Sequence, residues 1–351
     1  MVRSDVPKVR PMRRRRRFLV YGVGALAAAA AAGRMITRRD GRRLDPNDDD
    51  GLGSLRGEPR MVRGPRASQL YTETYPGHGT VVFTHGYCLT EAVWHYQKRD
   101  LADDFGLVTW DLPGHGHSPG VAPGRLSLGF CADALARVIE AATDGNVLLV
   151  GHSLGGVISL AYLARHHQAA AERVRGAVLV STPMTHLAGA VSGRWPGGAL
   201  ESKVVGRALQ YVVQSDLAER VLGRDVGRRD MSLSYRVVRW GFGRDPSPSQ
   251  VLFVRDAIAS VRPDIRAETH RIMADADVEG FLSDVTVPTL VVLGGRDRLV
   301  DPEESLAMAE LLPSGRAVAF PEAGHAVFLE DHEGFNAELR RFAARPLVDA
   351  S

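Results

Sequence analysis

The sequence predicts an α/β fold in which a mostly parallel sheet is covered by helices on both faces. Short apolar runs typical of buried strands alternate with stretches of helical periodicity, which is the pattern of successive βαβ units. One such run, Val147–Val150, leads into the sequence Gly-His-Ser-Leu-Gly at 151–155, and an apolar helical stretch follows over 157–165. A strand, a tight turn and a helix in this order place a side chain at the carboxyl edge of a sheet.

The remaining elements follow from the same two periodicities. Turn-forming residues such as those at 76–79 separate the strand candidates, and a glycine-rich loop over 111–118 follows one of them. The expected strands lie at 69–75, 80–84, 106–110, 147–150, 176–180, 287–295 and 316–320, and the expected helices in this part lie at 90–102, 128–142 and 157–165.

Residues 151–155 fit the G-x-S-x-G nucleophile elbow, with Ser153 as the nucleophile. A serine at a sharp strand-to-helix turn has a strained backbone, which costs about 1–3 kcal/mol. Gly151 and Gly155 keep Cβ atoms out of the crowded turn. The following helix directs free N–H groups and the positive end of its dipole towards the group that the serine attacks. The alternative is an incidental serine in a glycine-containing turn, and the flanking strand and helix argue against it.

Two later residues could activate this serine. Asp297 follows the strand expected at 287–295, and His325 follows the strand expected at 316–320, so both lie where open α/β sheets bind ligands. An imidazole can take the serine proton and return it to the leaving group, and a carboxylate behind the ring fixes its tautomer. Asp301 competes with Asp297 for the role of the acid.

Four motifs in chain order carry a family resemblance: His85-Gly86 after a strand, Asp-Leu-Pro-Gly-His-Gly-His-Ser at 111–118, the elbow, and the late Asp and His. Over 80–183 and 285–331 the chain resembles the α/β-hydrolase superfamily, in the cap-bearing serine esterase and lipase-like branch that includes enzymes similar to pimeloyl-carrier-protein methyl ester esterases.

The resemblance implies an α/β-hydrolase fold with an inserted helical cap and a Ser153-His325-Asp297 triad. It also implies an oxyanion hole formed by the backbone N–H groups of Tyr87 and Leu154. The residues around these groups, His85, Gly86, Gly151, His152 and Gly155, are expected to shape the loop and the elbow. Asp111 resembles an organiser of its own loop rather than the catalytic acid.

Nothing in the sequence calls for a metal or a cofactor. His85 and His115 have no ligand partner at a recognised spacing. Gly114 and Gly116 lack both the P-loop lysine and a G-x-G-x-x-G pattern. The two cysteines, Cys88 and Cys131, exclude a disulfide framework, and we expect two buried free thiols rather than one bridge.

The regular alternation of strands and helices stops over 183–284, where helices are expected at 202–213, 231–240, 249–258 and 263–274. This insertion resembles a helical cap, between a first core part at 68–182 and a second at 285–351. Six apolar residues could line an acyl pocket or form the core of the cap itself: Leu209, Val212, Val213, Val237, Trp240 and Phe253.

The N-terminal region is basic although the whole chain carries a net charge of only +3. Residues 1–67 contain 17 Lys and Arg against 7 Asp and Glu, whereas the remainder has a net charge of −7. Five arginines at 13–17 precede 15 apolar residues at 18–32. As a helix, this apolar segment would be about 22 Å long, which is too short to span a hydrocarbon core of about 30 Å.

Arg15-Arg16-Arg17-Phe18-Leu19 resembles the twin-arginine export pattern of two arginines, one free position, and then Phe-Leu. We therefore expect residues 1–33 to be a signal or membrane anchor, with membrane contact through 13–32, and residues 34–67 to be a linker. The alternative is a cytoplasmic enzyme with a disordered N-terminal extension. A basic N-terminal region followed by an acidic remainder does not indicate a nucleic-acid partner.

The sequence thus predicts a serine hydrolase that cleaves a small-molecule carboxylic ester or thioester, with an apolar acyl part, through an acyl-enzyme. The same triad also supports carbon–carbon bond hydrolysis, acyl transfer and cofactor-free perhydrolysis. A non-catalytic binding protein on this scaffold is the alternative from another class, and the presence of all three triad residues argues against it.

Overall fold

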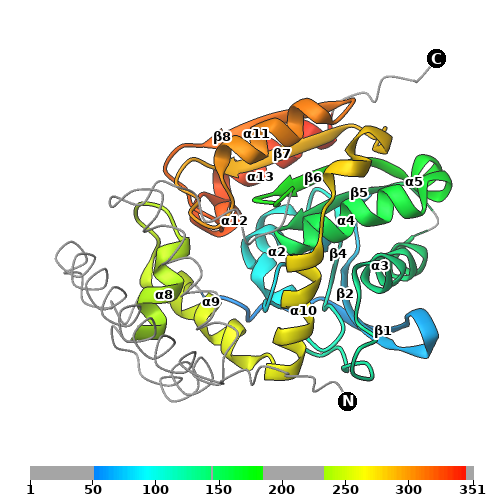
Figure 1. Ribbon diagram of the computed structural model, residues 1–351, viewed down its shortest axis with the longest axis horizontal. Coiled ribbons are helices and arrows are strands. Elements are labelled where there is room, and N and C mark those ends of the chain that lie inside the picture. The colour runs from blue at the N-terminus through cyan, green and yellow to red at the C-terminus, as the bar shows by residue number, and fades with distance from the viewer. Residues whose placement is uncertain (1–50, 144, 185–232, 345–351) are drawn as a thin grey trace, which may run out of the picture.

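The structure is a computed structural model and describes residues 51–143, 145–184 and 233–344 (Figure 1). These residues contain a single eight-stranded sheet with the strand order β1-β2-β4-β3-β5-β6-β7-β8. The pairs β1/β2 and β2/β4 are antiparallel and the other pairs are parallel, as predicted for a mostly parallel sheet. The strands are β1 (Glu58–Arg63), β2 (Gln69–Tyr75), β3 (Thr80–Thr84), β4 (Gly106–Trp110), β5 (Val147–His152), β6 (Val174–Val180), β7 (Thr289–Gly294) and β8 (Gly315–Phe320).

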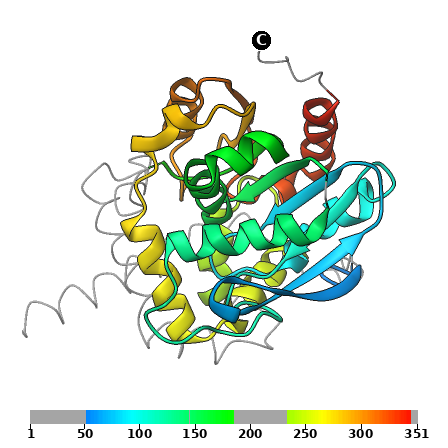
Figure 2. The same ribbon diagram turned by 90° about the vertical axis from the view of Figure 1, so that its right-hand side faces the viewer.

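Helices cover both faces of this sheet (Figures 1 and 2). The central strand β5 is buried on both sides, because Val147 and Leu149 belong to one hydrophobic core whereas Leu148 and Val150 belong to the other. This double burial explains its uninterrupted apolar sequence. The helices of the two layers are α2 (His95–Leu101), α3 (Leu128–Ala142), α4 (Leu154–Arg165), α5 (His167–Arg173), α11 (Pro302–Leu311), α12 (Val327–Glu330) and α13 (His332–Ala343), with short 3-10 helices η1 (Pro65–Ala67), η2 (Glu91–Trp94) and η3 (Glu279–Asp284).

Strand β1 corrects the predicted linker at 34–67, because the sheet begins at Glu58 rather than after residue 67. β1 pairs along its whole length with β2, from Glu58 opposite Thr74 to Arg63 opposite Gln69. Only Val62 of this strand is buried, so the sequence lacks the apolar alternation by which strands are identified. Charged residues and proline are typical of a strand at the edge of a sheet.

The described residues between β6 and β7, where the sequence predicts a cap, contain three α-helices: α8 (Leu233–Gly241), α9 (Pro248–Ser260) and α10 (Pro263–Asp275). α9 begins with a capping box, in which Ser247 and Gln250 each bind the other's backbone N–H, and Pro248 occupies its first turn. The helix predicted at 202–213 lies outside the described residues.

The two cysteines, Cys88 and Cys131, are free and buried, as predicted, and burial raises the pKa of each thiol to about 12. The basic and apolar segment at 13–32 lies outside the described residues. Among the helices that the structure describes, none combines the length and the apolar character needed to cross a membrane.

Candidate active site

Ser153 lies at the turn between β5 and α4 with a backbone φ of 51° and ψ of −117°. A positive φ is strained for a residue with a Cβ atom, as the elbow motif predicts. The backbone N–H of Ser153 donates to the carbonyl oxygen of Val180 at 2.8 Å, which fixes the turn to the neighbouring strand β6. The serine side chain is therefore presented at the carboxyl edge of the sheet.

The glycines of the elbow allow α4 to approach the sheet closely. A Cβ atom on Gly155 would collide with the backbone carbonyl oxygens of Thr84 and His85, at the end of β3. A Cβ atom on Gly151 would lie 2.5 Å from the carbonyl oxygen of Gly155. The first turn of α4 therefore packs directly against the backbone of β3, and Ser153 lies beside the loop that begins at His85.

The structure brings Asp297 and His325 together from two separate loops. Asp297 lies between β7 and α11, His325 lies between β8 and α12, and Nδ1 of His325 is 2.9 Å from Oδ2 of Asp297. The other carboxylate oxygen accepts the backbone N–H groups of Leu299 at 2.8 Å and Val300 at 3.0 Å. With Nδ1–H donating to the carboxylate, Nε2 is the ring nitrogen that can accept a proton.

Asp301, the competing candidate for the acid, has a different role. Its side chain accepts the backbone N–H of Glu303 at 3.0 Å and caps the N-terminus of α11. An aspartate at this position satisfies one of the free N–H groups of the helix. The structure therefore pairs His325 with Asp297.

His152 joins the elbow to the loop that bears His325. The Nε2–H of His152 donates to the backbone carbonyl oxygen of His325 at 3.1 Å, and the two rings meet edge to face with centroids 4.8 Å apart. Burial lowers the pKa of His152 well below its usual value, which keeps the ring neutral. In the described part of the chain no hydrogen bond joins the Ser153 hydroxyl to Nε2 of His325. Such contacts often form only with substrate bound.

The loop after β3 contains the expected oxyanion-hole residue Tyr87. Within the described residues, neither the backbone N–H of Tyr87 nor that of Leu154 has a hydrogen-bond acceptor, so both are available to a ligand. A Cβ atom on Gly86 would lie 2.7 Å from Nδ1 of His152, so this loop runs directly past the elbow. The Tyr87 hydroxyl donates to the carbonyl oxygen of Arg266 at 3.3 Å, which attaches the loop to α10.

His85 and Asp111 hold the loops around the site. The Nδ1–H of His85 donates to the Gly86 carbonyl at 2.8 Å while its Nε2 accepts the Leu112 N–H at 3.0 Å, and burial lowers its pKa to about 3. The Asp111 carboxylate accepts the backbone N–H groups of Glu91 and His117, each at 2.8 Å. Asp111 therefore organises its own loop, as the sequence predicts.

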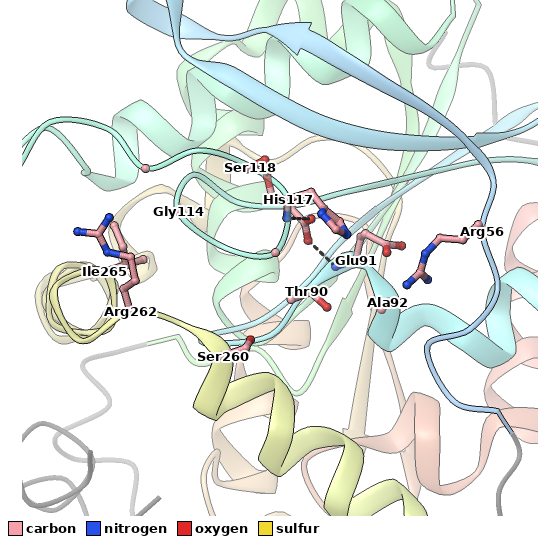
Figure 3. Close-up of a pocket in the computed structure, with 13 residues that line it drawn as sticks. Arg56, Thr90, Glu91, Ala92, Gly114, His117, Ser118, Ser260, Arg262 and Ile265 are labelled. Carbon is pink, nitrogen blue, oxygen red and sulfur yellow. Dashed lines mark hydrogen bonds between the residues drawn. The ribbon is translucent and has the colours of Figure 1, made fainter. Parts of the chain in front are cut away.

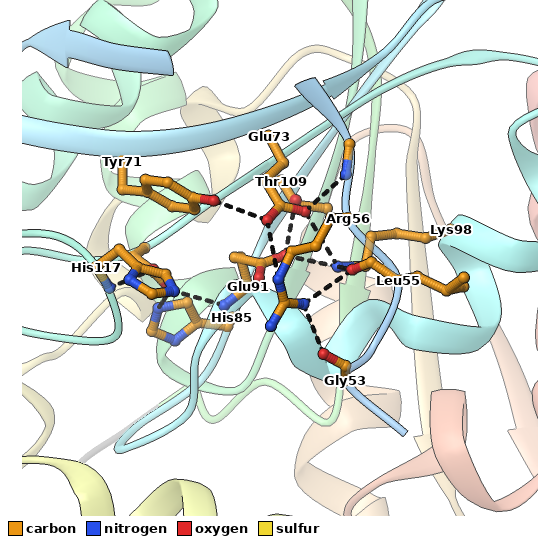
Figure 4. Close-up of polar contacts among 12 residues, drawn as sticks. Gly53, Leu55, Arg56, Tyr71, Glu73, His85, Glu91, Lys98, Thr109 and His117 are labelled. Carbon is orange, nitrogen blue, oxygen red and sulfur yellow. Dashed lines mark hydrogen bonds and ion pairs between the residues drawn. The ribbon is translucent and has the colours of Figure 1, made fainter. Parts of the chain in front are cut away.

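A cluster of buried charged side chains lies next to this loop and is not recognisable in the sequence (Figure 4). Lys98 Nζ lies 2.7 Å from the Glu91 carboxylate and 3.5 Å from that of Glu73. The Tyr71 hydroxyl donates to Glu73 at 2.8 Å, and the Arg56 guanidinium lies 3.8 Å from the same carboxylate. Two buried carboxylates thus share one buried ammonium group, and Arg56 supplies the second positive charge. The sequence gives little indication of this cluster, because Glu73 and Lys98 are isolated charged residues in a strand and a helix that show no other unusual feature.

A pocket of about 390 Å³ lies between the loop that follows β4 and the junction of α9 and α10 (Figure 3). Ile265 lines it and also packs with Cys88 and Tyr87, so the pocket borders the expected oxyanion loop. None of Ser153, Asp297 and His325 lines this pocket. Its wall is largely polar and consists of Arg56, Thr90, Glu91, Ala92, Asp111, Gly114, Gly116, His117, Ser118, Gly120, Ser260, Arg262 and Ile265.

None of the residues expected to line an acyl pocket contributes to this wall. Val237, Trp240 and Phe253 lie on α8 and α9, and Phe253 packs against the hydrophobic core that contains Phe83. Leu209, Val212 and Val213 lie outside the described residues. No cluster of three or more His, Cys, Asp or Glu side chains that could hold a metal ion occurs in the described ranges.

The chain is similar to known hydrolases in both sequence and fold. The model of the α/β-hydrolase family matches residues 81–338. A pimeloyl-[acyl-carrier protein] methyl ester esterase of Stenotrophomonas maltophilia is 33% identical over 271 residues, which cover 75% of this chain and 92% of the relative. An enzyme of the same name from Vibrio cholerae is 25% identical over 282 residues, which cover 79% and 98% of the two chains.

The fold is shared with solved structures of other proteins. An esterase from Exiguobacterium antarcticum has a TM-score of 0.63 at 23% identity, covering 81% of this chain and 99% of the other. A bromoperoxidase from Bacillus anthracis has a TM-score of 0.64 at 21% identity, covering 82% and 100% of the two chains. At these identities the likeness is one of fold.

Proposed function

Since the chain belongs to the α/β-hydrolase family and is an enzyme of its esterase branch, we propose that it cleaves a carboxylic ester or thioester through an acyl-enzyme on Ser153. The observation that carries this proposal is the 2.9 Å contact between His325 and Asp297 at the sheet edge where the elbow presents Ser153. Acid, base and nucleophile follow the three strands β7, β8 and β5. Their chain order is that of the triad in this fold.

The mechanism uses each residue in one role. Nε2 of His325 takes the proton of the Ser153 hydroxyl as Oγ attacks the carbonyl carbon of the substrate. Asp297 holds the ring orientation and stabilises the imidazolium that forms. The N–H groups of Tyr87 and Leu154 stabilise the negative charge on the tetrahedral oxygen. His325 then returns the proton to the departing alcohol or thiol, and water cleaves the acyl-enzyme with the same base.

The substrate class is inferred from the relatives. Both are named as esterases of a methyl ester carried on an acyl-carrier protein. A carboxylic ester of a small alcohol is therefore the first class to test, and the sequence adds the expectation of an apolar acyl part. Acyl transfer and perhydrolysis would use the same residues but would replace water by another acceptor, a second nucleophile or hydrogen peroxide respectively. Carbon–carbon bond hydrolysis would also use these residues and water, and it differs in the bond that is cleaved.

The test is replacement of Ser153 by alanine, with Ser159→Ala as the matched control. Ser159 lies within α4, six residues after Ser153, and its hydroxyl donates to the Gly155 carbonyl at 2.9 Å. We expect Ser153→Ala to abolish hydrolysis of short-chain nitrophenyl esters and labelling by a fluorophosphonate probe, while the protein stays folded. Undiminished labelling of Ser153→Ala would contradict the proposal. A panel of esters and thioesters of varied acyl length then identifies the preferred substrate.

We also infer that the basic and apolar segment at 13–32 directs the chain to a membrane or an export pathway. Its support is the sequence alone, in which five arginines precede 15 apolar residues. Cell fractionation of the full chain and of a chain lacking residues 1–50 tests this inference. An unchanged distribution between the two would favour a cytoplasmic enzyme.

A further inference from the structure

Glu330 holds the backbone on both sides of His325. It ends helix α12, five residues after the histidine. Its Oε1 accepts the backbone N–H of Gly324 at 2.9 Å and that of Ala326 at 3.2 Å. These are the residues immediately before and after His325, so one carboxylate oxygen binds the backbone on both sides of the proposed base.

The same carboxylate also reaches the inserted helices. Oε2 of Glu330 accepts the backbone N–H of Gly243, just after α8, at 2.6 Å. The backbone N–H of His325 itself donates to the carbonyl oxygen of Gly241 at 2.9 Å. A Cβ atom on Gly243 or on Gly324 would collide with the backbone of the other segment. The loop that carries His325 is therefore tightly packed against the end of α8.

The loop of the proposed acid is attached to the same place. The Arg298 guanidinium, next to Asp297, donates to the carbonyl oxygen of Trp240 in α8 at 2.9 Å. The end of α8 thus contacts both loops that hold the acid–base pair. Among the polar groups of His325, the described structure gives a partner to Nδ1, to the backbone N–H and to the carbonyl oxygen, and leaves Nε2 available for Ser153.

We propose that Glu330 is a positioning residue for His325, which sets the base relative to Ser153 and joins its loop to the inserted helix α8. The inference rests on the proposed function, because it assigns a partner to the proposed base. Glu330 suits this role because a carboxylate can accept several N–H groups at once and has no proton of its own to donate. A glutamine side chain could accept N–H groups at only one of these two positions, because its NH₂ group would face a backbone N–H at the other.

Glu330→Gln is the main test, and Glu322→Gln is the matched control. Glu322 lies three residues before His325, but its side chain is exposed and pairs at the surface with Arg296 and Arg244. A misplacement of about 1 Å in a catalytic group can reduce the rate by about 100-fold. We expect Glu330→Gln to lower kcat for nitrophenyl esters by about 10- to 100-fold with little change in KM, and to slow fluorophosphonate labelling by a similar factor. The control should match the unaltered enzyme in both measurements.

A residue that only supports the fold would give a different result. If Glu330→Gln, measured well below its melting temperature, labels at the unaltered rate and keeps the same kcat and the same pH profile, the proposal is overturned. If Ser153→Ala retains activity, the proposed function fails, whereas the amide contacts of Glu330 do not depend on that result.

A measurement on the unaltered protein covers the case in which Glu330→Gln does not fold. Hydrogen exchange of the backbone amides of Gly243, Gly324 and Ala326 should be slow, because all three donate to one carboxylate. Exchange as rapid as in an exposed loop would overturn the proposal. Slow exchange at all three amides supports it.

Discussion

Oδ2 of Asp297 accepts a hydrogen bond of 2.9 Å from Nδ1 of His325, while Oδ1 accepts two backbone N–H groups of its own loop. The carboxylate is thus oriented by its backbone before it orients the imidazole. Side-chain groups held in this way lose little freedom when the transition state forms, which is the condition for efficient acid–base catalysis.

Replacement of Asp297 by asparagine should lower kcat for ester hydrolysis by about 10³- to 10⁴-fold. The amide can present its NH₂ group to Nδ1 and so favour the imidazole tautomer that carries its proton on Nε2, which cannot accept the serine proton. Steady-state kinetics with nitrophenyl esters measure the loss, and circular dichroism checks that the variant is folded.

Asp301→Asn is the control for this variant. Asparagine caps a helix about as well as aspartate, so the cap of α11 should survive and activity should not change. Equal losses of activity in the two variants would contradict the assignment of Asp297 as the partner of His325.

Gly155→Ala should destabilise the protein by about 1–3 kcal/mol or more, because the new methyl group would collide with the carbonyl oxygens of Thr84 and His85. The control is Gly280→Ala, since a Cβ atom at Gly280 meets no other atom within 4 Å. Urea unfolding at one temperature compares the two variants. If Gly155→Ala is as stable as Gly280→Ala, then α4 does not pack against β3 as closely as described.

The local sequence was sufficient to predict those parts of the structure that depend on residues close together in the chain. Val147–Val150 is apolar because both of its faces are buried, and the glycines at 151 and 155 mark a turn that no other residue fits. These signals depend on periodicity and on steric exclusion, which act over a few residues. The elbow and seven of the eight strands in the described ranges could be located from them.

Contacts between distant segments could not be predicted in the same way. β1 is an edge strand with one buried residue, so its place in the sheet depends on β2 rather than on its own pattern. The choice between Asp297 and Asp301 depends on which of them meets His325, and spacing along the chain does not distinguish the two. Glu330 is one of many acidic residues in the sequence, and only the folded chain shows three backbone N–H groups around it.

The position of β1 changes what an N-terminal truncation should do. Removal of residues 1–50 leaves every described element in place, so ester hydrolysis and stability should be retained. Removal of residues 1–67 also takes away β1, the Leu55 carbonyl that accepts from Lys98 at 3.2 Å, and Arg56. We expect this shorter chain to be less stable by at least about 1–3 kcal/mol, because buried Lys98 and Glu73 lose partners.

Thermal or urea unfolding of the two truncated chains checks this expectation, and hydrolysis of a nitrophenyl ester shows whether each remains active. Equal stability of the two chains would mean that β1 and Arg56 contribute nothing to the fold. That outcome would favour the prediction from the sequence alone, in which the linker extends to residue 67.

Asp111 should make stability fall as pH rises towards neutrality. Burial raises the pKa of its carboxyl group from 3.8 to about 7, although the N–H groups of Glu91 and His117 favour the ionised form and oppose this effect. Between these two values the unfolded chain has released a proton that the folded protein keeps. The contribution of Asp111 is therefore complete below pH 3.8 and is lost as pH rises through about 7.

Asp111→Asn isolates this contribution, because asparagine does not titrate. Urea unfolding of both proteins at several pH values from about 4 to 8 gives the difference in their free energies of unfolding, and we expect the advantage of the unaltered protein to shrink by roughly 1–4 kcal/mol across that range. Asp103→Asn, at an exposed position, should leave the pH dependence as it is in the unaltered protein. A difference between Asp111→Asn and the unaltered protein that stays constant with pH would show that Asp111 is ionised in the folded state throughout, held by its two backbone N–H groups.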